Sequence, residues 1–400
     1  MKKTAIFALE YLFCCMKIIY IYTALLTKGG ADRVITEKAN WLAEHGHDVT
    51  IVTDTQLGRE PVFALSPKVK LHDLAIDFSK EYGHILLLRA WWYFVLMRRY
   101  KKALCNFLCN ERPDIVVTTL GRELDFLPYI KDDSVKVGES HIARKYSRNF
   151  HLMEQKGGAH KLLVKIWRKK QEKDVSRLDG LVLLTHQDAD SWKGVTRTFV
   201  IPNSLPFYPN RISKCDNKRA ICVGRLNEQK GYEYLIDAWS LVTKKHPDWK
   251  LDVFGDGEIR AELQERINSK GLNKCFFLKA PVSAIMEEYL DSSLYIMSSR
   301  YEGFGMVLIE AMACGLPCVS FDCPYGPSDI IKNGEDGYLI EYLNTQALAD
   351  GICKLIEDDE LRREMGRRGR TNVLRFSREN VMQQWVDLFE SLKNMKGVIK

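Results

Sequence analysis

Short apolar runs alternate with helical patterns along almost the whole chain, and this rhythm limits the folds that the chain can adopt. Strand-length runs separated by helix-length stretches build parallel sheets from β–α–β units. The expected strands are Lys17–Thr23, Asp48–Thr53, Asp114–Leu120, Val135–Val137 and Gly180–Leu184 in the first half, and Arg219–Val223, Trp249–Phe254, Lys274–Leu278, Ser293–Met297 and Pro317–Phe321 in the second. The sequence therefore predicts an α/β protein with two Rossmann-like, doubly wound parallel-sheet domains.

A stretch rich in proline and asparagine separates the two halves of this pattern. Pro202, Pro206 and Pro209 break both strand and helix periodicity, as expected of a linker. A chain of 400 residues is long enough for two separate cores. The expected segments are an N-terminal extension over 1–15, a first domain over 16–203, a linker over 204–218, a second domain over 219–377, and a C-terminal helix over 378–400 that packs back across to the first domain.

The first fifteen residues bear only a faint likeness to a secretion signal. Lys2 and Lys3 precede a short apolar run, but Glu10 interrupts it and no small-x-small cleavage site follows. We expect Met16 to open the first strand. No other apolar run reaches the ~20 residues of a membrane helix, and the eleven cysteines have no even framework, which favours a reducing compartment. The expected location is cytoplasmic, with peripheral attachment to the cytoplasmic membrane as an option.

The net charge of +7 is concentrated in two stretches of the first half. One is basic and aromatic: Arg98, Arg99 and Lys101 with Trp91, Trp92, Tyr93 and Phe94. The other is basic and aliphatic: Lys161, Lys165, Arg168, Lys169, Lys170 and Lys173 with Leu162, Leu163, Ile166 and Trp167. Two interpretations stay open, namely amphipathic helices with solvated basic faces and contact with the inner face of an anionic membrane. Nucleic acid is not an expected partner, because no binding motif accompanies the charge.

The segment Gly224–Gly231, with the sequence GRLNEQKG, lies between a predicted strand and a predicted helix. Arg225 and Lys230 are then at the carboxyl edge of a parallel strand, where open α/β sheets bind ligands. Two cations beside a helix N-terminus suit a diphosphate, because free backbone N–H groups and the helix dipole add to the side-chain charge. Taken alone, the segment also fits a turn with two solvated cations.

The segment Arg300–Pro317 carries two carboxylates separated by seven residues. Glu302 is expected in a loop, and Glu310 is expected on the helix that follows. Gly303 and Gly305 allow the backbone between them to approach a ligand closely. A carboxylate among apolar neighbours needs hydrogen-bond donors, and the hydroxyl groups of a sugar or a ribose would supply them.

Together these motifs resemble glycosyltransferase family 4, whose members are retaining enzymes of the GT-B fold, with two Rossmann-like domains facing each other across a cleft. Glu302 and Glu310 match the family's E-x7-E element, and Arg225 and Lys230 match its basic element. The glycine-rich loop after the first strand stands here at residues 28–31. The segment 321–340 is similar to members that build bacterial surface polysaccharides, and the resemblance extends from residue 16 to about residue 389.

The resemblance also implies a role for each matching residue. Arg225 and Lys230 would hold the donor diphosphate, and Glu310 would bind the ribose hydroxyls. His141 matches the active-site histidine of the family and would lie near a hydroxyl of the donor sugar. The implied catalytic residues are His141, Arg225, Lys230 and Glu302, and the implied donor-binding residues are Gly29, Gly30, Arg225, Lys230, Gly303, Phe304, Gly305, Met306 and Glu310.

The implied reaction moves a hexose or N-acetylhexosamine from a nucleotide-diphosphate sugar to a glycan or lipid-linked saccharide acceptor, with retention of configuration. The acceptor belongs to capsule or lipopolysaccharide synthesis, the nucleotide sugar is a co-substrate, and no cofactor is expected. A GxGxxG dinucleotide fingerprint is absent from the segment 28–31, which counts against an NAD enzyme. A nucleotide-sugar epimerase, a sugar phosphorylase and a catalytically silent binding subunit remain as alternatives.

A metal site is not expected, although two features of the sequence raise the question. Asp188 and Asp190 form a D-x-D pair, but they fall in the first turn of a predicted helix, where acids complement the dipole without a metal. Cys314, Cys318 and Cys323 lie in an apolar run without histidine partners or paired CxxC spacing. These cysteines are interpreted as small buried hydrophobic residues.

Overall fold

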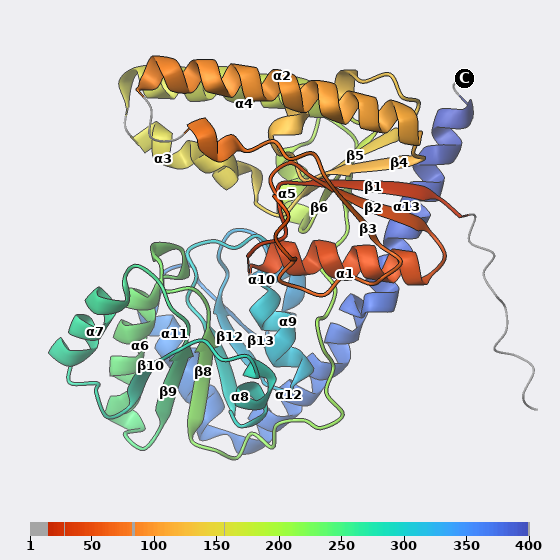
Figure 1. The fold of residues 1–400 in the computed structure, drawn as a ribbon. Coiled ribbons are helices and arrows are strands. Elements are labelled where there is room, and N and C mark those ends of the chain that lie inside the picture. Colours follow the sequence, from red (N-terminus) through yellow and green to blue (C-terminus); the bar gives the residue numbers. More distant parts are fainter. Residues whose placement is uncertain (1–14, 28, 82–84, 156, 399–400) are drawn as a thin grey trace, which may run out of the picture.

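A computed structural model describes residues 15–27, 29–81, 85–155 and 157–398 of the chain (Figure 1). Almost all of the expected N-terminal extension, together with Lys28 of the glycine-rich loop, lies outside these residues. Two parallel sheets organise the rest, which confirms the predicted α/β class and the two Rossmann-like domains. No helix among the described residues has the length and apolar character required to cross a bilayer.

The first sheet has seven parallel strands. In spatial order they are β3 (Lys70–Asp73), β2 (Asp48–Thr53), β1 (Lys17–Tyr22), β4 (Ile115–Thr118), β5 (Val135–Ser140), β6 (Gly180–Leu183) and β7 (Thr198–Val200). The inner strands are mostly buried; β1, for example, places Ile18 and Ile19 at zero exposure. Strands buried on both faces consist of nearly continuous apolar residues, so their positions can be predicted from the sequence.

The second sheet repeats the same strand order with six strands. They are β10 (Phe276–Lys279), β9 (Lys250–Phe254), β8 (Arg219–Val223), β11 (Leu294–Met297), β12 (Cys318–Phe321) and β13 (Gly337–Ile340). The cysteines at 314, 318 and 323 are all buried and reduced in the core of this domain.

The helices cover both faces of each sheet, as Figure 1 shows. In the first domain they are α1 (Gly30–Glu44), α2 (Leu86–Glu111), α3 (Phe150–Gln155), α4 (Gly158–Val175) and α5 (His186–Ser191). In the second half of the chain they are α6 (Tyr232–Lys245), α7 (Arg260–Ser269), α8 (Ile285–Leu290), α9 (Met306–Ala313), α10 (Pro327–Ile330), α11 (Thr345–Glu357), α12 (Asp359–Asn372) and α13 (Arg378–Val398).

Helix α13 belongs to the second half of the sequence but packs into the core of the first domain. Trp385 and Phe389 are buried in one apolar cluster with Ile18 of β1 and Ile35 of α1. In Figure 1 the blue helix leaves the lower domain and runs along the upper one. The chain therefore passes between the domains twice, once through residues 201–218 and once before α13.

The strand order of each sheet reverses at one point, between β1 and β4 in the first domain and between β8 and β11 in the second. At such a switch point the loops at the carboxyl ends of two adjacent strands diverge and leave a crevice, which is where doubly wound sheets bind ligands. The loops after β1, β8 and β11 contain Gly29, Arg225 and Glu302, in that order.

Candidate active site

The loop that follows β8 is held against the loop that follows β11. The backbone N–H of Arg300 donates to the carbonyl of Gln229 over 2.7 Å, and the Ser298 hydroxyl donates to the carbonyl of Lys230 over 3.0 Å. Gly231 begins α6 from a left-handed conformation, with φ of 58°, and a Cβ there would lie 2.4 Å from the Ser298 carbonyl oxygen. Glycine alone fits so close an approach, so the two loops form one surface.

The two predicted cations have different surroundings on this surface. Lys230 Nζ lies 2.7 Å from Glu302 Oε1, and the Ser299 hydroxyl donates to the same oxygen over 2.6 Å. Burial disfavours the charged ammonium, but the Glu302 carboxylate outweighs that effect and raises the pKa of Lys230. Arg225 is exposed, and its side chain makes no hydrogen bond or ion pair with another described residue. One cation is therefore fixed and the other is available to a ligand.

Glu310 lies on α9, one turn into the helix, as the sequence predicts. Gly305, with φ of 99°, caps the N-terminus of this helix. The Glu310 side chain is 9% exposed and accepts a hydrogen bond from the Tyr289 hydroxyl over 3.2 Å. Burial raises the pKa of the Glu310 carboxyl to about 7, and the charge of Arg33 on α1 opposes the rise only in part. This carboxyl therefore changes its ionisation close to neutral pH.

Gly303 marks the place where the two domains touch at the site. A Cβ on Gly303 would lie 2.6 Å from the carbonyl oxygen of His141, which follows β5 in the first domain. Phe304 beside it is buried, and Met306 is the first residue of α9. The backbone between Gly303 and Met306 thus runs directly past His141, and the structure brings the predicted histidine to the predicted carboxylate element.

Gly29 and Gly30 open α1 as predicted, with Gly29 in an extended conformation at the helix N-cap. Figure 1 places α1 along the boundary between the two domains. Arg33, one turn further along α1, is close enough for its charge to act on Glu310 of the second domain. The start of α1 therefore lies on the side of the first domain that faces α9.

A buried ion pair lies next to His141, and no pattern in the sequence predicts it. Glu139 on β5 pairs with Lys38 of α1, and both side chains are almost fully buried. His141 Nε2 lies 3.1 Å from Glu139 Oε1. Burial would raise the pKa of the Glu139 carboxyl, but the Lys38 ammonium and His141 lower it to about 2. Lys38 also lies over the ring of Trp385 from α13, 4.3 Å from its centroid.

Aromatic and polar contacts join the facing loops of the two domains. Tyr146 of the first domain stacks on Tyr301 of the second, with ring centroids 3.5 Å apart and an interplanar angle of 8°. The backbone N–H of Tyr325 donates to the Gln187 side chain over 2.7 Å. These contacts flank the line where His141 meets Gly303, so the domains are closed on each other beside the site.

A pocket of about 240 Å³ opens in the first domain next to His141. It lies at the carboxyl ends of β1, β4 and β5, and its wall includes Tyr22, Thr119, Arg144, Gln171 and Trp192. Hydroxyl, amide and guanidinium groups alternate there with aromatic rings. Such a lining suits a polar ligand with apolar faces, and a sugar ring has that character.

Two further glycines, which the sequence motifs above do not include, pack against the backbone of the basic loop. Gly255 and Gly257 follow β9 in the sequence GDG. A Cβ on Gly255 would lie 1.9 Å from the Gly224 carbonyl oxygen, and one on Gly257 would lie 2.1 Å from the Leu226 carbonyl oxygen. Their backbone therefore packs directly under the segment that carries Arg225. Two glycines separated by one residue after a predicted strand are a signal that could have revealed this contact.

The two aspartates of the D-x-D pair, Asp188 and Asp190, lie in different environments. Asp188 is buried at the start of α5 and accepts hydrogen bonds from the Arg144 backbone over 2.9 Å and the Ser191 hydroxyl over 3.2 Å. Asp190 is exposed and pairs with Lys193 over 2.7 Å. The two carboxylates accordingly serve separate local contacts.

The comparison with known families gives one match, to the family described as glycosyl transferases group 1, over residues 209–372. This range contains Arg225, Lys230, Glu302 and Glu310, and it lies in the second half of the chain. The family match therefore coincides with the loops that form the site surface in the second domain.

Two curated relatives align over almost their whole length. An uncharacterized glycosyltransferase of Haemophilus influenzae is 28% identical over 92% of this chain and 98% of its own length. The amylovoran biosynthesis glycosyltransferase AmsD of Erwinia amylovora is 28% identical over 93% of this chain and 99% of its own length. Both names describe the same class of activity.

A solved structure with the same architecture is a variant of TarM from S. aureus in complex with fondaparinux, alpha-GlcNAc-glycerol and UDP. It superposes with a TM-score of 0.72, at 18% identity, over 94% of this chain and 99% of the other. At that identity the likeness establishes the GT-B fold. With the fold, the site loops and the family match in agreement, this chain carries a glycosyltransferase domain of group 1 over residues 209–372.

Proposed function

We propose that this enzyme transfers a hexose or N-acetylhexosamine from a nucleotide-diphosphate sugar to a glycan or lipid-linked saccharide, with retention of configuration and without a metal ion. One observation carries the proposal. Lys230, fixed by Glu302, lies in the same loop as the unpaired Arg225 at the switch point of the second sheet, and Gly303, next to Glu302, lies against His141 of the first domain. Such an arrangement gives a diphosphate two cations and gives the sugar beyond it a carboxylate and an imidazole.

Each group then has a place along the donor. Arg225 and Lys230 hold the diphosphate, and Glu310 accepts hydrogen bonds from the ribose hydroxyls. Glu302 and the backbone from Gly303 to Met306 hold the transferred sugar and its phosphate. The contact between Gly303 and the His141 carbonyl supports this assignment, because it brings the histidine within reach of the same sugar.

The chemistry required of these residues is chiefly electrostatic. When the sugar leaves, negative charge grows on the phosphate oxygens, and fixed cations with backbone N–H groups stabilise that charge without reorganising. Two cations of this kind take the place that a divalent metal occupies in other transferases. For retention, the acceptor attacks on the face from which the diphosphate departs, and a phosphate oxygen accepts the acceptor's proton.

The pocket beside His141 is the proposed acceptor site. It opens at the carboxyl edge of the first sheet, opposite the proposed donor site, and its aromatic and hydrogen-bonding lining suits a saccharide. Two similarities favour a surface polysaccharide as the product. AmsD is named for amylovoran biosynthesis, and the TarM complex contains UDP together with a GlcNAc-glycerol.

A donor panel tests the proposal against its alternatives. The full chain is incubated with each nucleotide sugar, with and without a mixture of saccharide acceptors, and release of the nucleoside diphosphate is measured. A transferase releases it quickly only with the right donor and acceptor together. Interconversion of donor sugars without acceptor would instead identify an epimerase, release that requires inorganic phosphate would identify a phosphorylase, and binding without turnover a silent subunit.

The elevated pKa of Glu310 predicts a pH dependence of donor use. The ionised carboxylate is the better acceptor for two ribose hydroxyls, and its pKa of about 7 means that it forms as the pH rises through neutrality. We expect kcat/KM for the donor to rise across this range, and Glu310→Gln to remove the rise and lower the plateau about 10–100-fold. Initial rates between pH 5.5 and 8.5 test this.

The matched control for that measurement is Glu265→Gln, which changes an exposed carboxylate on α7 of the same domain. It should keep the wild-type profile. A rise that persists unchanged in Glu310→Gln assigns the titration to another group and removes Glu310 from the ribose site.

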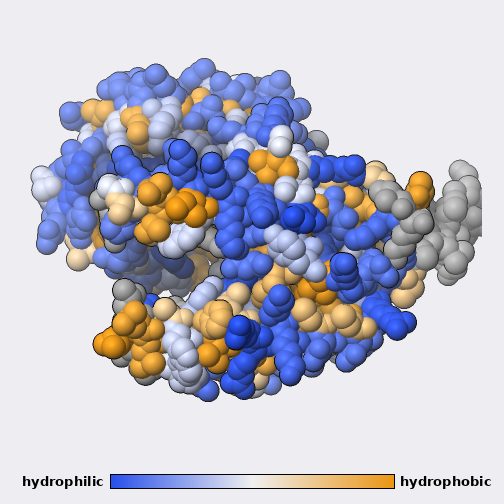
Figure 2. Space-filling view, turned by 90° about the horizontal axis from the view of Figure 1, so that it is seen from above, coloured by the Kyte–Doolittle hydropathy of each residue, from blue (hydrophilic) through white to orange (hydrophobic). Residues whose placement is uncertain are grey.

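We also propose that helices α2 and α4 attach the enzyme to an anionic membrane. Large apolar side chains on both helices are exposed, among them Leu87 at 81%, Trp91 at 54%, Leu162 at 62% and Ile166 at 53%. Both helices run across the top of the first domain in Figure 1, and Figure 2, seen from that side, shows apolar patches among hydrophilic residues. Exposed apolar and basic residues together match the interface of a bilayer with acidic headgroups.

Replacing Arg98, Arg99 and Lys101 with Gln is expected to weaken sedimentation with anionic vesicles roughly a hundredfold, at about 1 kcal/mol per basic residue. All three are exposed on α2. The matched control replaces Arg363, Arg367 and Arg368 on α12, which removes the same charge from an exposed face of the other domain. Equal losses in the two variants would mean that only net charge matters and would remove α2 from the proposal.

A further inference from the structure

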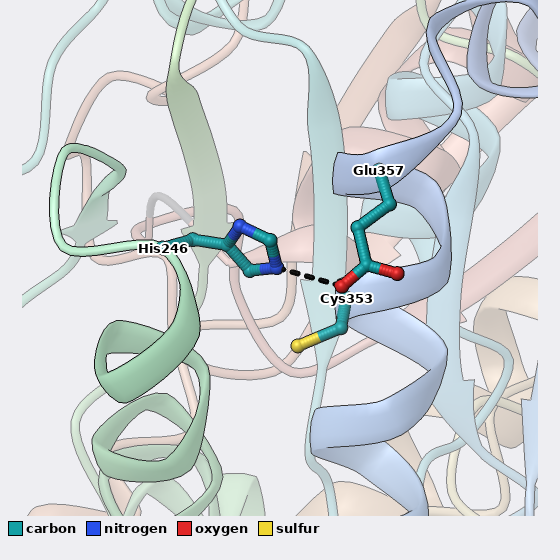
Figure 3. Close-up of side chains that lie close together, drawn as sticks. All are labelled: His246, Cys353 and Glu357. Carbon is teal, nitrogen blue, oxygen red and sulfur yellow. Dashed lines mark hydrogen bonds and ion pairs between the residues drawn. The ribbon is translucent and has the colours of Figure 1, made fainter.

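Three side chains with metal-binding atoms converge at the end of the second domain that lies away from the active site. His246 follows the last residue of α6, and Cys353 and Glu357 lie on the adjacent α11 (Figure 3). One ligand atom from each, an imidazole nitrogen, the thiol sulfur and a carboxylate oxygen, lies within 4.8 Å of the other two. His246 Nε2 and Glu357 Oε1 are 3.0 Å apart.

We propose that His246, Cys353 and Glu357 form a binding site for a divalent ion of the zinc class. The combination of imidazole nitrogen, thiolate sulfur and carboxylate oxygen fits Zn²⁺, whereas Mg²⁺ and Ca²⁺ prefer oxygen ligands alone. Three protein ligands leave the fourth tetrahedral position to water. The side chain of Glu357 is 56% exposed, so an ion can enter from solvent.

Helix geometry supports the site. Cys353 and Glu357 are four residues apart on α11, so they project from the same face of the helix on successive turns. His246 reaches this face from α6, the neighbouring helix. The imidazole nitrogen and the carboxylate oxygen are already in contact, and the thiol sulfur lies within 4.8 Å of both ligand groups.

The local field also favours a cation there. Glu357 is the last residue of α11 and His246 caps the C-terminus of α6, so the negative ends of two helix dipoles meet at the site. A carboxylate at a helix C-terminus is unfavourable unless positive charge accompanies it. Asp350 adds negative charge near the thiol, and Lys245 opposes it. Lysines already stand in the last turns of both helices, and a bound divalent ion adds to their positive charge.

Binding requires loss of one proton. A cysteine thiol is protonated near neutral pH, and the thiolate is the form that binds a metal ion. The sulfur–metal bond forms as the S–H bond breaks and the proton passes to solvent. Neither oxidation nor reduction takes place. Calorimetric titrations in buffers of different ionisation enthalpy should therefore show release of close to one proton for each ion bound.

The site is structural in this proposal and separate from sugar transfer. Helix α6 has 14 residues and spans about 21 Å at 1.5 Å per residue. It begins next to the loop of Arg225 and Lys230 and ends at His246. An ion therefore links α6 to α11 at the sheet edge opposite the proposed donor site, and transfer should continue without it.

Cobalt titration of the full chain tests the proposal, because Co²⁺ bound to a thiolate gives a near-ultraviolet charge-transfer band and tetrahedral Co²⁺ gives visible bands. We expect both, saturating at one ion per chain and disappearing when Zn²⁺ is added. Cys353→Ser should abolish the near-ultraviolet band. His246→Ala and Glu357→Gln should weaken binding by at least ~10–100-fold, the loss that even outer-shell partners cause. Zn²⁺ at a hundredfold excess over its dissociation constant should raise Tm by roughly 5 °C.

Two matched variants separate this site from general metal binding. His186→Ala removes a surface histidine that pairs with Asp329 over 2.6 Å but has no thiol in that pair. Cys275→Ser removes a half-buried thiol elsewhere in the same domain. Both should bind Co²⁺ as the wild type does. Cys353→Ala serves as a second variant if the serine variant unfolds, with Tm measured in chelator.

The proposal is overturned if no thiolate band appears, if the band survives in Cys353→Ser, or if the two control variants lose it equally. Since binding is read without any sugar substrate, its failure leaves the transferase proposal unaffected, and failure of the donor panel leaves the metal site unaffected. A simple hydrogen bond between His246 and Glu357 would then be the whole role of the pair.

Discussion

Replacing Arg225 with Ala is expected to lower the rate of sugar transfer by on the order of 10²–10³, or about 3–4 kcal/mol in the barrier, at saturating donor. Arg225 makes no hydrogen bond or ion pair to the described residues, so its loss should leave Tm unchanged. Arg225→Lys should restore only part of the rate, because an ammonium cannot reproduce the two-pronged guanidinium contact with phosphate. Initial rates with the best donor of the panel, together with thermal unfolding, measure both effects.

Lys230→Ala should lower transfer by a similar factor but, unlike Arg225→Ala, should also reduce stability. The substitution leaves the buried Glu302 carboxylate with the Ser299 hydroxyl and without its cation. Lys279→Ala is the matched control, because Lys279 is an exposed cation at the end of β10, on the outer edge of the same sheet. Wild-type rates in either loop variant would contradict the assignment of the diphosphate to this loop.

Excess chelator provides the complementary measurement. With Arg225 and Lys230 as the cations of the site, transfer should continue after chelation, even though chelation empties the proposed zinc site. Activity that is lost with chelator and restored by magnesium or manganese would contradict the metal-free mechanism.

Glu139→Ala is expected to produce the largest loss of stability among single changes near the site, about 3–5 kcal/mol. The substitution leaves the Lys38 ammonium buried at 3% exposure without its anion. Chemical denaturation monitored by tryptophan fluorescence measures the loss. If the isolated variant does not fold, Glu139→Gln gives a milder loss of the same kind, because the amide keeps a hydrogen-bond acceptor.

The double variant Lys38→Met, Glu139→Leu separates stability from catalysis. Replacing both charges with apolar side chains of similar volume should recover most of the stability, since no unpaired charge remains. Transfer should stay low, because His141 still lacks the carboxylate 3.1 Å from its Nε2. Full activity in a stable double variant would show that the pair serves the fold alone.

The same pair sets an acid limit on stability. The Glu139 pKa is lowered from 4.5 to about 2 in the fold, so its contribution is complete above pH 4.5 and is lost as the pH falls toward 2. The double variant has no such carboxylate and should lose less stability across that window. This comparison uses the same denaturation assay at several pH values.

The sequence predicts strands well where they are buried and poorly where they form edges. Every inner strand of both sheets appears as an apolar run, whereas three of the four strands at the sheet ends, β3, β7 and β13, were not predicted; β10 is the exception. Those strands have only three or four residues and partly exposed side chains, as in β3. A short half-exposed strand has no distinctive hydrophobic pattern, and pairing with its neighbour decides its conformation.

The site residues differ in the same way: some belong to one short sequence motif, and others have partners far away in the sequence. Arg225, Lys230, Glu302 and Glu310 could be identified because each follows a strand or begins a helix within one short motif, although their roles stay predictions. The partnership of Lys38 with Glu139 spans 101 residues, and a lysine on an amphipathic helix reads as a surface residue. Folding alone brings the two together, so no spacing in the sequence could reveal the pair.

The packing of α13 reverses the order in which the two domains can be finished during synthesis. The core of the first domain includes Trp385, Phe389 and Leu392, which leave the ribosome almost two hundred residues after β7. Until then the face of the first sheet that they cover is open to water, while the second sheet is already complete. The second domain should therefore be the first to reach its native state, and the first domain should depend on chaperones or on rapid elongation to avoid aggregation in the interval.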